Sequence, residues 1–324
     1  MRDESSSCGR VALERWAPRP AAALDALETS VWRAVAEAGW VDLFDLTARA
    51  VAGLHGLEPL ERPRTSGPSP WAGVDATRWR ALQDLGPDQR KALAFAEQMS
   101  FDVASLGATE RDALYEALGT RAPLFAQASY VADLLPRARA ALDVLFGESE
   151  PRTGPPAAGS PSGDPPEAAD LARAIDDLIR VVPSLQALDP VTTELVRLLG
   201  ARRHRCRICQ SVRSRSALAA GADDALFAAV DEHATSDLEP AQRAALAFAE
   251  AMLGVPGRVD HDRAQGLRTH FPPAACVELV LDLTRNATNK VAVALAADAP
   301  RVESGYEIYD VTPEGELLYG LDAP

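Results

Sequence analysis

Apolar residues recur at three- and four-residue spacing along most of the chain, which is the spacing of amphipathic helices. Strand-like alternation and Asn-Gly hairpin signals are missing from both halves of the sequence. The pattern therefore predicts an all-α fold. Residues 301–324 differ, because GYEIYDV and ELLYGL alternate apolar and polar residues around a Pro-Glu-Gly turn. They predict a short β-hairpin or an extended arm that covers a neighbouring subunit, and a frayed tail is the alternative.

A segment rich in proline, glycine and serine, residues 149–167, interrupts the helical pattern. We interpret it as an interdomain linker between a helical domain at 19–148 and another at 168–300. The charged residues 1–18 are expected to form a flexible tail.

The two domains carry an internal repeat. LGPDQRKALAFAEQM at 85–99 and LEPAQRAALAFAEAM at 238–252 are identical at 11 of 15 positions, with a constant offset of 153 residues. This offset is far longer than a solenoid repeat, so it indicates a duplicated domain. Pro87 and Pro240 are each placed to begin a helix, because a proline in the first turn loses no helical hydrogen bond.

In the second copy, Asp189 and Pro190 form a helix start, with the aspartate as N-cap. A second helix is expected from Arg205 or Cys206 through Leu218, ending at Gly221. The periodicity predicts further helices over residues 223–232, 240–253, 260–270 and 273–297.

Composition narrows the function classes. The chain has 324 residues, 47% of them hydrophobic, and a formal net charge of −14, which argues against nucleic-acid binding over its whole surface. No apolar run is long enough to span a membrane, and the charged start MRDESSSCGR is unlike a signal peptide. We therefore expect a cytoplasmic protein without membrane or nucleic-acid partners. Four cysteines are too few for a disulfide scaffold.

Cys206 and Cys209 form a C-x-x-C motif at a predicted helix start, so both sulfurs lie on one face of that helix. The helix N-terminus and nearby cations favour the thiolate, which is the reactive form of cysteine. The cations are seven arginines with no acid among them: Arg197, Arg202, Arg203, Arg205, Arg207, Arg213 and Arg215. This cluster should attract an anionic substrate or partner.

Two other interpretations of the cysteine pair stay open. His204 with Cys206 and Cys209 offers three zinc ligands, but a structural site needs four, and Cys8 and Cys276 have no second close partner. The pair could instead be inert core residues, as we expect for Cys276 in its apolar helix. The remaining histidines, His55, His233, His261 and His270, are expected at the surface.

Residues 189–300 resemble the alkylhydroperoxidase D and carboxymuconolactone decarboxylase family, through TELVRLLGARRHRCRICQSVRSRSALAAGA, LEPAQRAALAFAEAMLGVPGRVD and CVELVLDLTRNATNKVAVALAAD. Redox-active members carry a glutamate twelve residues before the C-x-x-C and a histidine four residues after it. Glu194, Cys206 and Cys209 match these positions, whereas Arg213 stands where the family has its relay histidine. A guanidinium can hold a thiolate by charge but cannot shuttle a proton.

The resemblance implies a thiol oxidoreductase without a cofactor or metal. Cys209 would attack a hydroperoxide and Cys206 would then close a disulfide, which an external dithiol protein would reduce. Glu194 would accept a proton or pair with Arg213. Arg205 and Arg207 are candidates to bind an anionic substrate, as are Asn286 and Asn289, for which capping or packing is the alternative.

The first domain lacks the cysteine pair, because Ala38 and Val41 stand at its corresponding positions. We interpret it as a degenerate copy that imitates the dimer of single-domain relatives, and expect the chain itself to form a homo-oligomer. Two other functions stay open. One is decarboxylase or lactone-type chemistry on a carboxylated small molecule, and the other is a non-catalytic helical scaffold.

Overall fold

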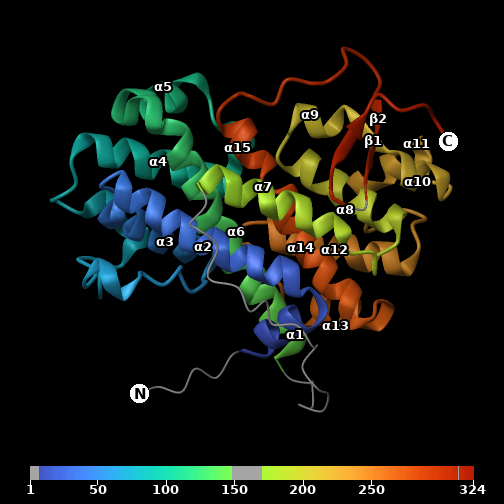
Figure 1. Ribbon diagram of the computed structural model, residues 1–324, viewed down its shortest axis with the longest axis horizontal. Helices are drawn as coiled ribbons and strands as arrows, with labels where there is room; N and C mark the ends of the chain where they lie inside the picture. Colours follow the sequence, from blue (N-terminus) through green and yellow to red (C-terminus); the bar gives the residue numbers. More distant parts are fainter. Residues whose placement is uncertain (1–6, 148–169, 313) are drawn as a thin grey trace.

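The computed structural model describes residues 7–147, 170–312 and 314–324, and helices dominate it (Figure 1). The first half contains α1 (Cys8–Trp16), α2 (Pro18–Glu37), α3 (Val41–His55), α4 (Pro87–Asp102), α5 (Ala108–Leu118) and α6 (Ala122–Phe146). The second half contains α7 (Leu171–Val181), α8 (Pro190–Arg203), α9 (Arg207–Gln210), α10 (Arg215–Ala219), α11 (Asp224–Ala228), α12 (Pro240–Leu253), α13 (His261–His270), α14 (Pro273–Asn286) and α15 (Asn289–Ala294). The all-α prediction is confirmed, and the predicted linker at 149–167 lies outside the described residues.

Short 3₁₀ turns connect several of these helices: η1 (Arg64–Ser66), η2 (Ala76–Ala81), η3 (Val103–Ser105), η4 (Gly119–Arg121), η5 (Val182–Ser184) and η6 (Ala229–Glu232). The strands are β1 (Val212–Ser214), β2 (Glu307–Val311) and β3 (Leu317–Tyr319), in the order β1-β2-β3. β2 and β3 are antiparallel, which confirms the predicted C-terminal hairpin, and β1 pairs with β2 in parallel. The C-terminal arm therefore packs against its own chain.

The predicted helix starts are confirmed where the sequence has an N-cap residue or a proline in the first turn. The Asp189 side chain accepts a hydrogen bond from the Thr192 N–H at 2.9 Å, and Pro190 is the first residue of α8. The repeated helices α4 and α12 begin at Pro87 and Pro240. The next helices, α5 and α13, begin at residues 108 and 261, so the 153-residue offset continues beyond the repeated sequence.

Two predicted helices are interrupted. The helix expected from Cys206 to Gly221 ends at Gln210, because β1 follows at once and pairs with β2. The helix expected over 273–297 ends at Asn286 and starts again at Asn289. At the first break, pairing of β1 with β2 outweighs the helical periodicity.

The prediction of a flexible tail at 1–18 is wrong for its described part. Residues 8–16 form α1, in which Ala12 and Leu13 are buried and which contacts α6. The Arg10 guanidinium also pairs with Asp25 of α2, with an Nη1 to Oδ1 distance of 2.5 Å. The apolar face of α1 therefore belongs to the core.

The two halves share one hydrophobic core. The described core residues from α1 to α15 form a single contiguous cluster. α6 contacts helices of both halves, including α3, α13 and α14. In Figure 1 it runs through the middle of the molecule between the two groups of helices. The two sequence copies are thus folded against each other.

A buried network of charged groups lies at this junction. Asp133 of α6 accepts hydrogen bonds from Arg137 Nε at 2.8 Å and from Lys290 Nζ of α15 at 2.5 Å. Ser100 Oγ also donates to Asp133, at 2.8 Å. All these side chains are nearly inaccessible to solvent. The two cations hold the pKa of the Asp133 carboxyl well below its usual range, against the opposing effect of burial.

The same network binds the backbone of the second half. Arg137 Nη1 donates to the carbonyls of Met252 and Gly254 at 3.1 and 2.8 Å. The Gly257 N–H donates to His55 Nδ1 at 2.9 Å. The prediction of a surface position is therefore wrong for His55, and it is wrong for His233, which is 7% exposed. Burial lowers the pKa of His55.

Two buried carboxyls on α14 make the stability depend on pH. Burial and the neighbouring Asp282 raise the pKa of Glu278 to about 7, and burial raises that of Asp282 to about 6. The folded protein therefore binds these protons more tightly than the unfolded chain does. Stability falls as the pH rises from about 4.5 towards 7, because the burial of an ionised carboxylate is unfavourable.

Glu278→Gln is expected to raise Tm by about 2–4 °C at pH 8, with a gain that shrinks as the pH falls towards about 5. The amide oxygen can still accept the bonds that Glu278 Oε2 accepts from the Ala187 and Leu188 N–H groups, at 2.6 and 3.2 Å. Thermal unfolding across this pH range checks it, with the exposed Glu303→Gln as control. A gain of equal size at every pH would contradict the assignment.

Candidate functional site

The cysteine pair follows α8 directly. Arg205 turns the chain with a φ of +49°, and Cys206 is the N-cap of the one-turn helix α9. The two sulfurs lie 2.7 Å apart, with the Cys206 S–H directed at Cys209. Cys206 is fully buried, whereas Cys209 is partly accessible. The Cys209 sulfur is therefore accessible to a small molecule, whereas the Cys206 sulfur is accessible only to Cys209.

The environment distinguishes the two thiols. The hydrogen bond from Cys206 lowers the pKa of Cys209 to about 7, with further help from the Arg197 charge and from Asn289 Nδ2, which donates to the sulfur at 3.6 Å. The same hydrogen bond, together with burial, raises the pKa of Cys206. Cys209 is thus the more acidic thiol of the pair, and Cys206 keeps its proton in the hydrogen bond between them.

This difference predicts a pH profile for alkylation. The rate of iodoacetamide addition to Cys209 is expected to rise with a midpoint near pH 7, because only the thiolate reacts. Cys206→Ala removes the hydrogen-bond donor and should move the midpoint upward, whereas Cys206→Ser keeps a donor and should move it less. Peptide mass spectrometry follows Cys209 separately from the exposed Cys8, which serves as the internal reference. A midpoint in Cys206→Ala equal to that of the wild type would contradict this assignment.

Glu194 lies beside the thiols in a buried ion pair. Its carboxylate binds Arg197 through two bonds, of 2.6 Å to Nε and 2.7 Å to Nη2. The Ser214 N–H donates to the same carboxylate at 3.2 Å, and the Tyr309 hydroxyl at 3.1 Å. The expected pairing of Glu194 with Arg213 is therefore wrong, because Arg197 occupies the carboxylate.

Arg197 connects this ion pair to the thiol loop. Its Nη1 donates to the Cys209 carbonyl at 2.7 Å, and its Nη2 donates to the Val212 carbonyl at 3.0 Å. The guanidinium also lies over the Tyr309 ring, 5.4 Å from the centroid. Arg197 thus brings a fixed positive charge to Cys209 from one turn beyond Glu194 on α8.

Arg213 does not interact with the Cys209 thiolate as the sequence predicts. Because α9 ends at Gln210, Arg213 lies on β1, where its Nη1 donates to the Gln210 and Val212 carbonyls at 2.9 and 2.8 Å. Its guanidinium packs over the rings of Tyr306 and Phe227, at 5.0 and 5.4 Å. It is absent from the wall of the cavity beside Cys209. The prediction that it holds the thiolate one helical turn away is wrong.

The rest of the arginine cluster is partly neutralised by acids that lie far away in the sequence. Arg207 pairs with Asp298, at 2.7 Å between Nη2 and Oδ1, and Arg202 pairs with Asp231 at 2.8 Å. Arg205 is exposed. Arg205 and Arg207 both lie outside the residues that line the cavity. The predicted role of these two in substrate binding therefore has no support from this cavity.

Cys209 opens into a cavity of about 260 Å³ between the thiol loop, the end of α14 and the C-terminal hairpin. The cavity wall combines apolar side chains with a few polar groups and two arginines. Its residues are Ile179, Arg197, Ile208, Cys209, Val212, Arg285, Asn286, Thr288, Asn289, Ala292, Tyr309, Leu317 and Tyr319. A site of this size suits a small molecule, because pockets for larger ligands measure roughly 300–1,000 Å³.

Asn286 and Asn289, which the sequence indicates as candidates to bind the substrate, both line this cavity. Asn289 also joins the thiol to His204, because its Oδ1 accepts from His204 Nδ1 at 2.8 Å while its amide donates to Cys209. Burial lowers the pKa of His204 to about 3, so the imidazole is neutral. Among the described residues, no group of three His, Cys, Asp or Glu side chains is arranged to hold a metal.

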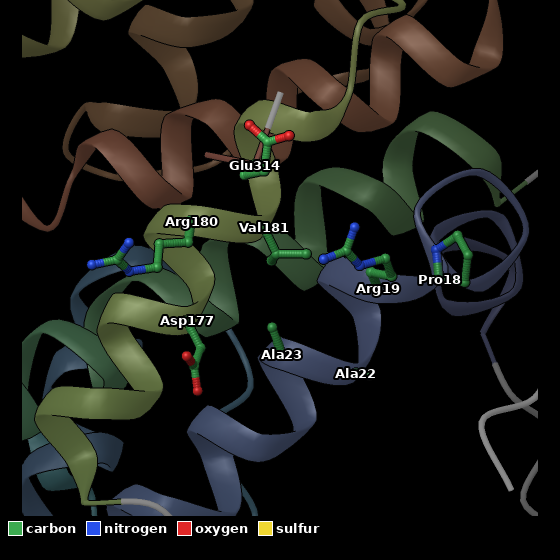
Figure 2. A pocket seen from close by; sticks show the side chains of 8 residues that line it. All are labelled: Pro18, Arg19, Ala22, Ala23, Asp177, Arg180, Val181 and Glu314. Atoms are coloured by element: carbon green, nitrogen blue, oxygen red, sulfur yellow. The ribbon is translucent and has the colours of Figure 1, made fainter. Parts of the chain in front are cut away.

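A larger hollow of about 590 Å³ lies elsewhere, between α2 and α7. Figure 2 shows its two arginines, Arg19 and Arg180, on different helices, and Asp177 and Glu314 also line it. All four residues are exposed to solvent. The residues that line this hollow include no cysteine or histidine. The paired thiols therefore adjoin the smaller cavity and not this hollow. None of the described helices has the length and apolar character needed to cross a membrane.

The fold and the site define an all-α protein with a paired-thiol cavity that its own C-terminal hairpin lines in part. The chain is 40% identical over 236 residues to two proteins of Mycobacterium tuberculosis. They are "Uncharacterized protein Rv2313c" of strain ATCC 25618 / H37Rv and "Uncharacterized protein MT2376" of strain CDC 1551 / Oshkosh, and the match covers 72% of this chain and 82% of each relative. The chain belongs to the family of these two proteins. Neither a protein-family profile nor a solved structure matches it.

Sequence reasoning missed three residues of the site: Arg197, Arg285 and Tyr309. Arg197 was visible as one of seven clustered arginines, and its i+3 spacing from Glu194 on a helix was a signal for an ion pair. Tyr309 reaches the site only because β2 pairs with β1. No local pattern in the sequence links it to the cysteines.

Proposed function

We propose that this protein is a thiol–disulfide oxidoreductase that reduces small hydroperoxides through Cys209 and Cys206, in the manner of the alkylhydroperoxidase D group. One observation carries the proposal. A partly accessible thiol with a lowered pKa faces a cavity, and a second thiol lies 2.7 Å behind it. A purely structural pair would require neither the cavity nor the difference between the two thiols.

The first step is nucleophilic attack by the Cys209 thiolate on the terminal oxygen of the hydroperoxide. A sulfur–oxygen bond forms, the oxygen–oxygen bond breaks, and Cys209 becomes a sulfenic acid. The departing alkoxide takes up a proton and leaves as an alcohol. Water that enters the cavity supplies this proton, because the Tyr309 hydroxyl donates to Glu194 and burial raises its pKa, so that it stays protonated.

The second step closes the disulfide. The Cys206 sulfur attacks the Cys209 sulfenic acid, a sulfur–sulfur bond forms, and the hydroxyl group leaves as water with the Cys206 proton. An external dithiol protein then supplies two electrons and two protons and restores both thiols. A reducing compartment such as the cytoplasm would keep the resting pair reduced.

The ion pair of Glu194 and Arg197 positions this chemistry. Arg197 donates a hydrogen bond to the Cys209 carbonyl, and its charge lowers the pKa of the Cys209 thiol. Glu194 fixes the position of Arg197 and accepts a hydrogen bond from the Tyr309 hydroxyl. The family's relay histidine has no counterpart at Arg213. We therefore expect the proton to come from water, with a slower turnover than that of members which carry the relay.

Oxidation of the reduced protein with one equivalent of hydroperoxide tests the proposal. Intact mass is expected to fall by about 2 Da, with Cys206 and Cys209 in one disulfide-linked peptide pair and Cys276 still free. A dithiol should then restore the original mass. No reaction at the pair, combined with turnover of a carboxylated lactone, would favour the decarboxylase-type function instead.

A further inference from the structure

The two arginines in the wall of the Cys209 cavity are not equivalent. Arg197 is occupied by the Glu194 carboxylate and by the Cys209 and Val212 carbonyls. Among the described residues, Arg285, near the end of α14, has no such set of partners. Within the described part of the chain, its guanidinium has one charged contact, with Asp282 at 3.6 Å between Nη1 and Oδ1.

Arg285 is nevertheless held inside the protein. Its side chain is 11% exposed, and it shares the cavity wall with Cys209, Asn286 and Asn289. A guanidinium has five N–H donors in a planar fork that matches a carboxylate. A contact of 3.6 Å to Asp282 leaves most of these donors free to bind a ligand in the cavity.

The cavity wall also contains apolar side chains, among them Ile179, Ile208 and Leu317. A ligand that fills this space would therefore have an apolar body and one anionic end. Its reactive group would face Cys209 while its anionic end binds Arg285. At about 260 Å³ the cavity limits the ligand to a small molecule.

We propose that Arg285 binds the carboxylate of the substrate, so that the cavity selects small organic hydroperoxides that carry a carboxylate group. The inference rests on the function proposed for the cysteine pair and specifies its substrate class. Arg285 makes no bond to sulfur in this scheme and acts by orienting the substrate.

A matched pair of alkylating reagents tests the charge preference at Cys209 directly. Iodoacetate and iodoacetamide have nearly the same shape and differ in charge. At a fixed pH near 7.5, the ratio of the iodoacetate rate to the iodoacetamide rate is measured at Cys209 and at the exposed Cys8 of the same molecule. We expect this ratio to be about tenfold higher at Cys209, since fixed cations concentrate an anion in a cavity.

Arg285→Gln should lower the ratio at Cys209 to within about twofold of the ratio at Cys8, and Arg285→Lys should restore part of the preference. Arg203→Gln removes the same charge from an exposed arginine outside the cavity wall, and should leave the ratio unchanged. An unchanged ratio in Arg285→Gln, with rapid alkylation by both reagents, would overturn the inference and leave the redox proposal intact.

A measurement on the wild-type protein makes the test independent of variant folding. Propionate should slow the carboxymethylation of Cys209, whereas propionamide and chloride at equal ionic strength should not. Equal effects of propionate and chloride would count against a carboxylate site. If Cys209 reacts with iodoacetamide no faster than Cys8 does, the activated thiol itself is absent, and both proposals fail.

Discussion

Cys209→Ser is expected to abolish hydroperoxide reduction, with a fall in rate on the order of 10³-fold or more, because the variant lacks the nucleophile. Cys209 is the thiol that faces the cavity, and its pKa of about 7 makes about half of it thiolate at neutral pH. A serine hydroxyl at this position stays protonated. Peroxide consumption with a dithiol reductant measures the loss.

Cys206→Ser should fail at a different step. The Cys209 thiolate is still present, so one equivalent of hydroperoxide should be consumed and the reaction should stop at the sulfenic acid. Intact mass should rise by about 16 Da, and a sulfenic-acid trap should label Cys209. Cys206 is fully buried behind Cys209, which suits a thiol that reacts only with its neighbour.

Cys276→Ser is the matched control for both variants. Cys276 is completely buried in α14, and burial raises the pKa of its thiol to about 11, so it should contribute nothing to turnover. Full activity in Cys209→Ser would disprove the assigned nucleophile. Full activity in Cys206→Ser would show that an external thiol, rather than Cys206, resolves the sulfenic acid.

Asp133→Asn is expected to reduce the free energy of unfolding by about 3–5 kcal/mol, because it removes one partner of a buried ionic network and leaves the others. Arg137 would stay charged in the core without a carboxylate, and Lys290 would lose the contact that favours its charged form against the effect of burial, which lowers its pKa. Both cations also contribute to joining the two halves of the chain. Chemical unfolding at neutral pH measures the change.

An exposed ion pair provides the control for this variant. Lys91 Nζ lies 2.9 Å from Glu116, whose side chain is 73% exposed, so Glu116→Gln should cost less than about 1 kcal/mol. Adding Lys290→Met to Asp133→Asn should recover part of the loss, since it removes one uncompensated charge. Equal losses in Asp133→Asn and Glu116→Gln would mean that the network adds little to stability.

The fold is predictable in its helical elements because their signals are local. Pro240 as the first residue of α12, the Asp189 N-cap and the repeat offset of 153 residues all follow from residues close together in the sequence. The predicted helix from Cys206 to Gly221 is wrong for the opposite reason. Its residues favour a helix locally, but pairing with β2, almost a hundred residues later, extends Val212–Ser214 into a strand.

In the candidate site, too, the features that depend on local sequence are predictable and those that depend on tertiary contacts are not. The spacing of Glu194, Cys206 and Cys209 indicates that these groups lie near one another, because one helix and the following turn carry them all. The ion-pair partner of Glu194 could not be predicted from sequence spacing. Arg197 and Arg213 both lie within reach along the sequence, and the break after α9 is what turns Arg213 towards Tyr306 and Phe227.

The sequence by itself determined the helical class of this protein, its internal duplication and the position of its thiol pair, because each depends on interactions within a few turns of the chain. The tertiary structure alone decided which thiol faces a cavity, which arginine supplies its charge, and that the C-terminal hairpin lines the site. It also decided that Asp133 and Lys290 meet across the two halves. The physical reason is that burial and electrostatic interactions depend on distances in space, which residues far apart in the sequence acquire only when the chain has folded.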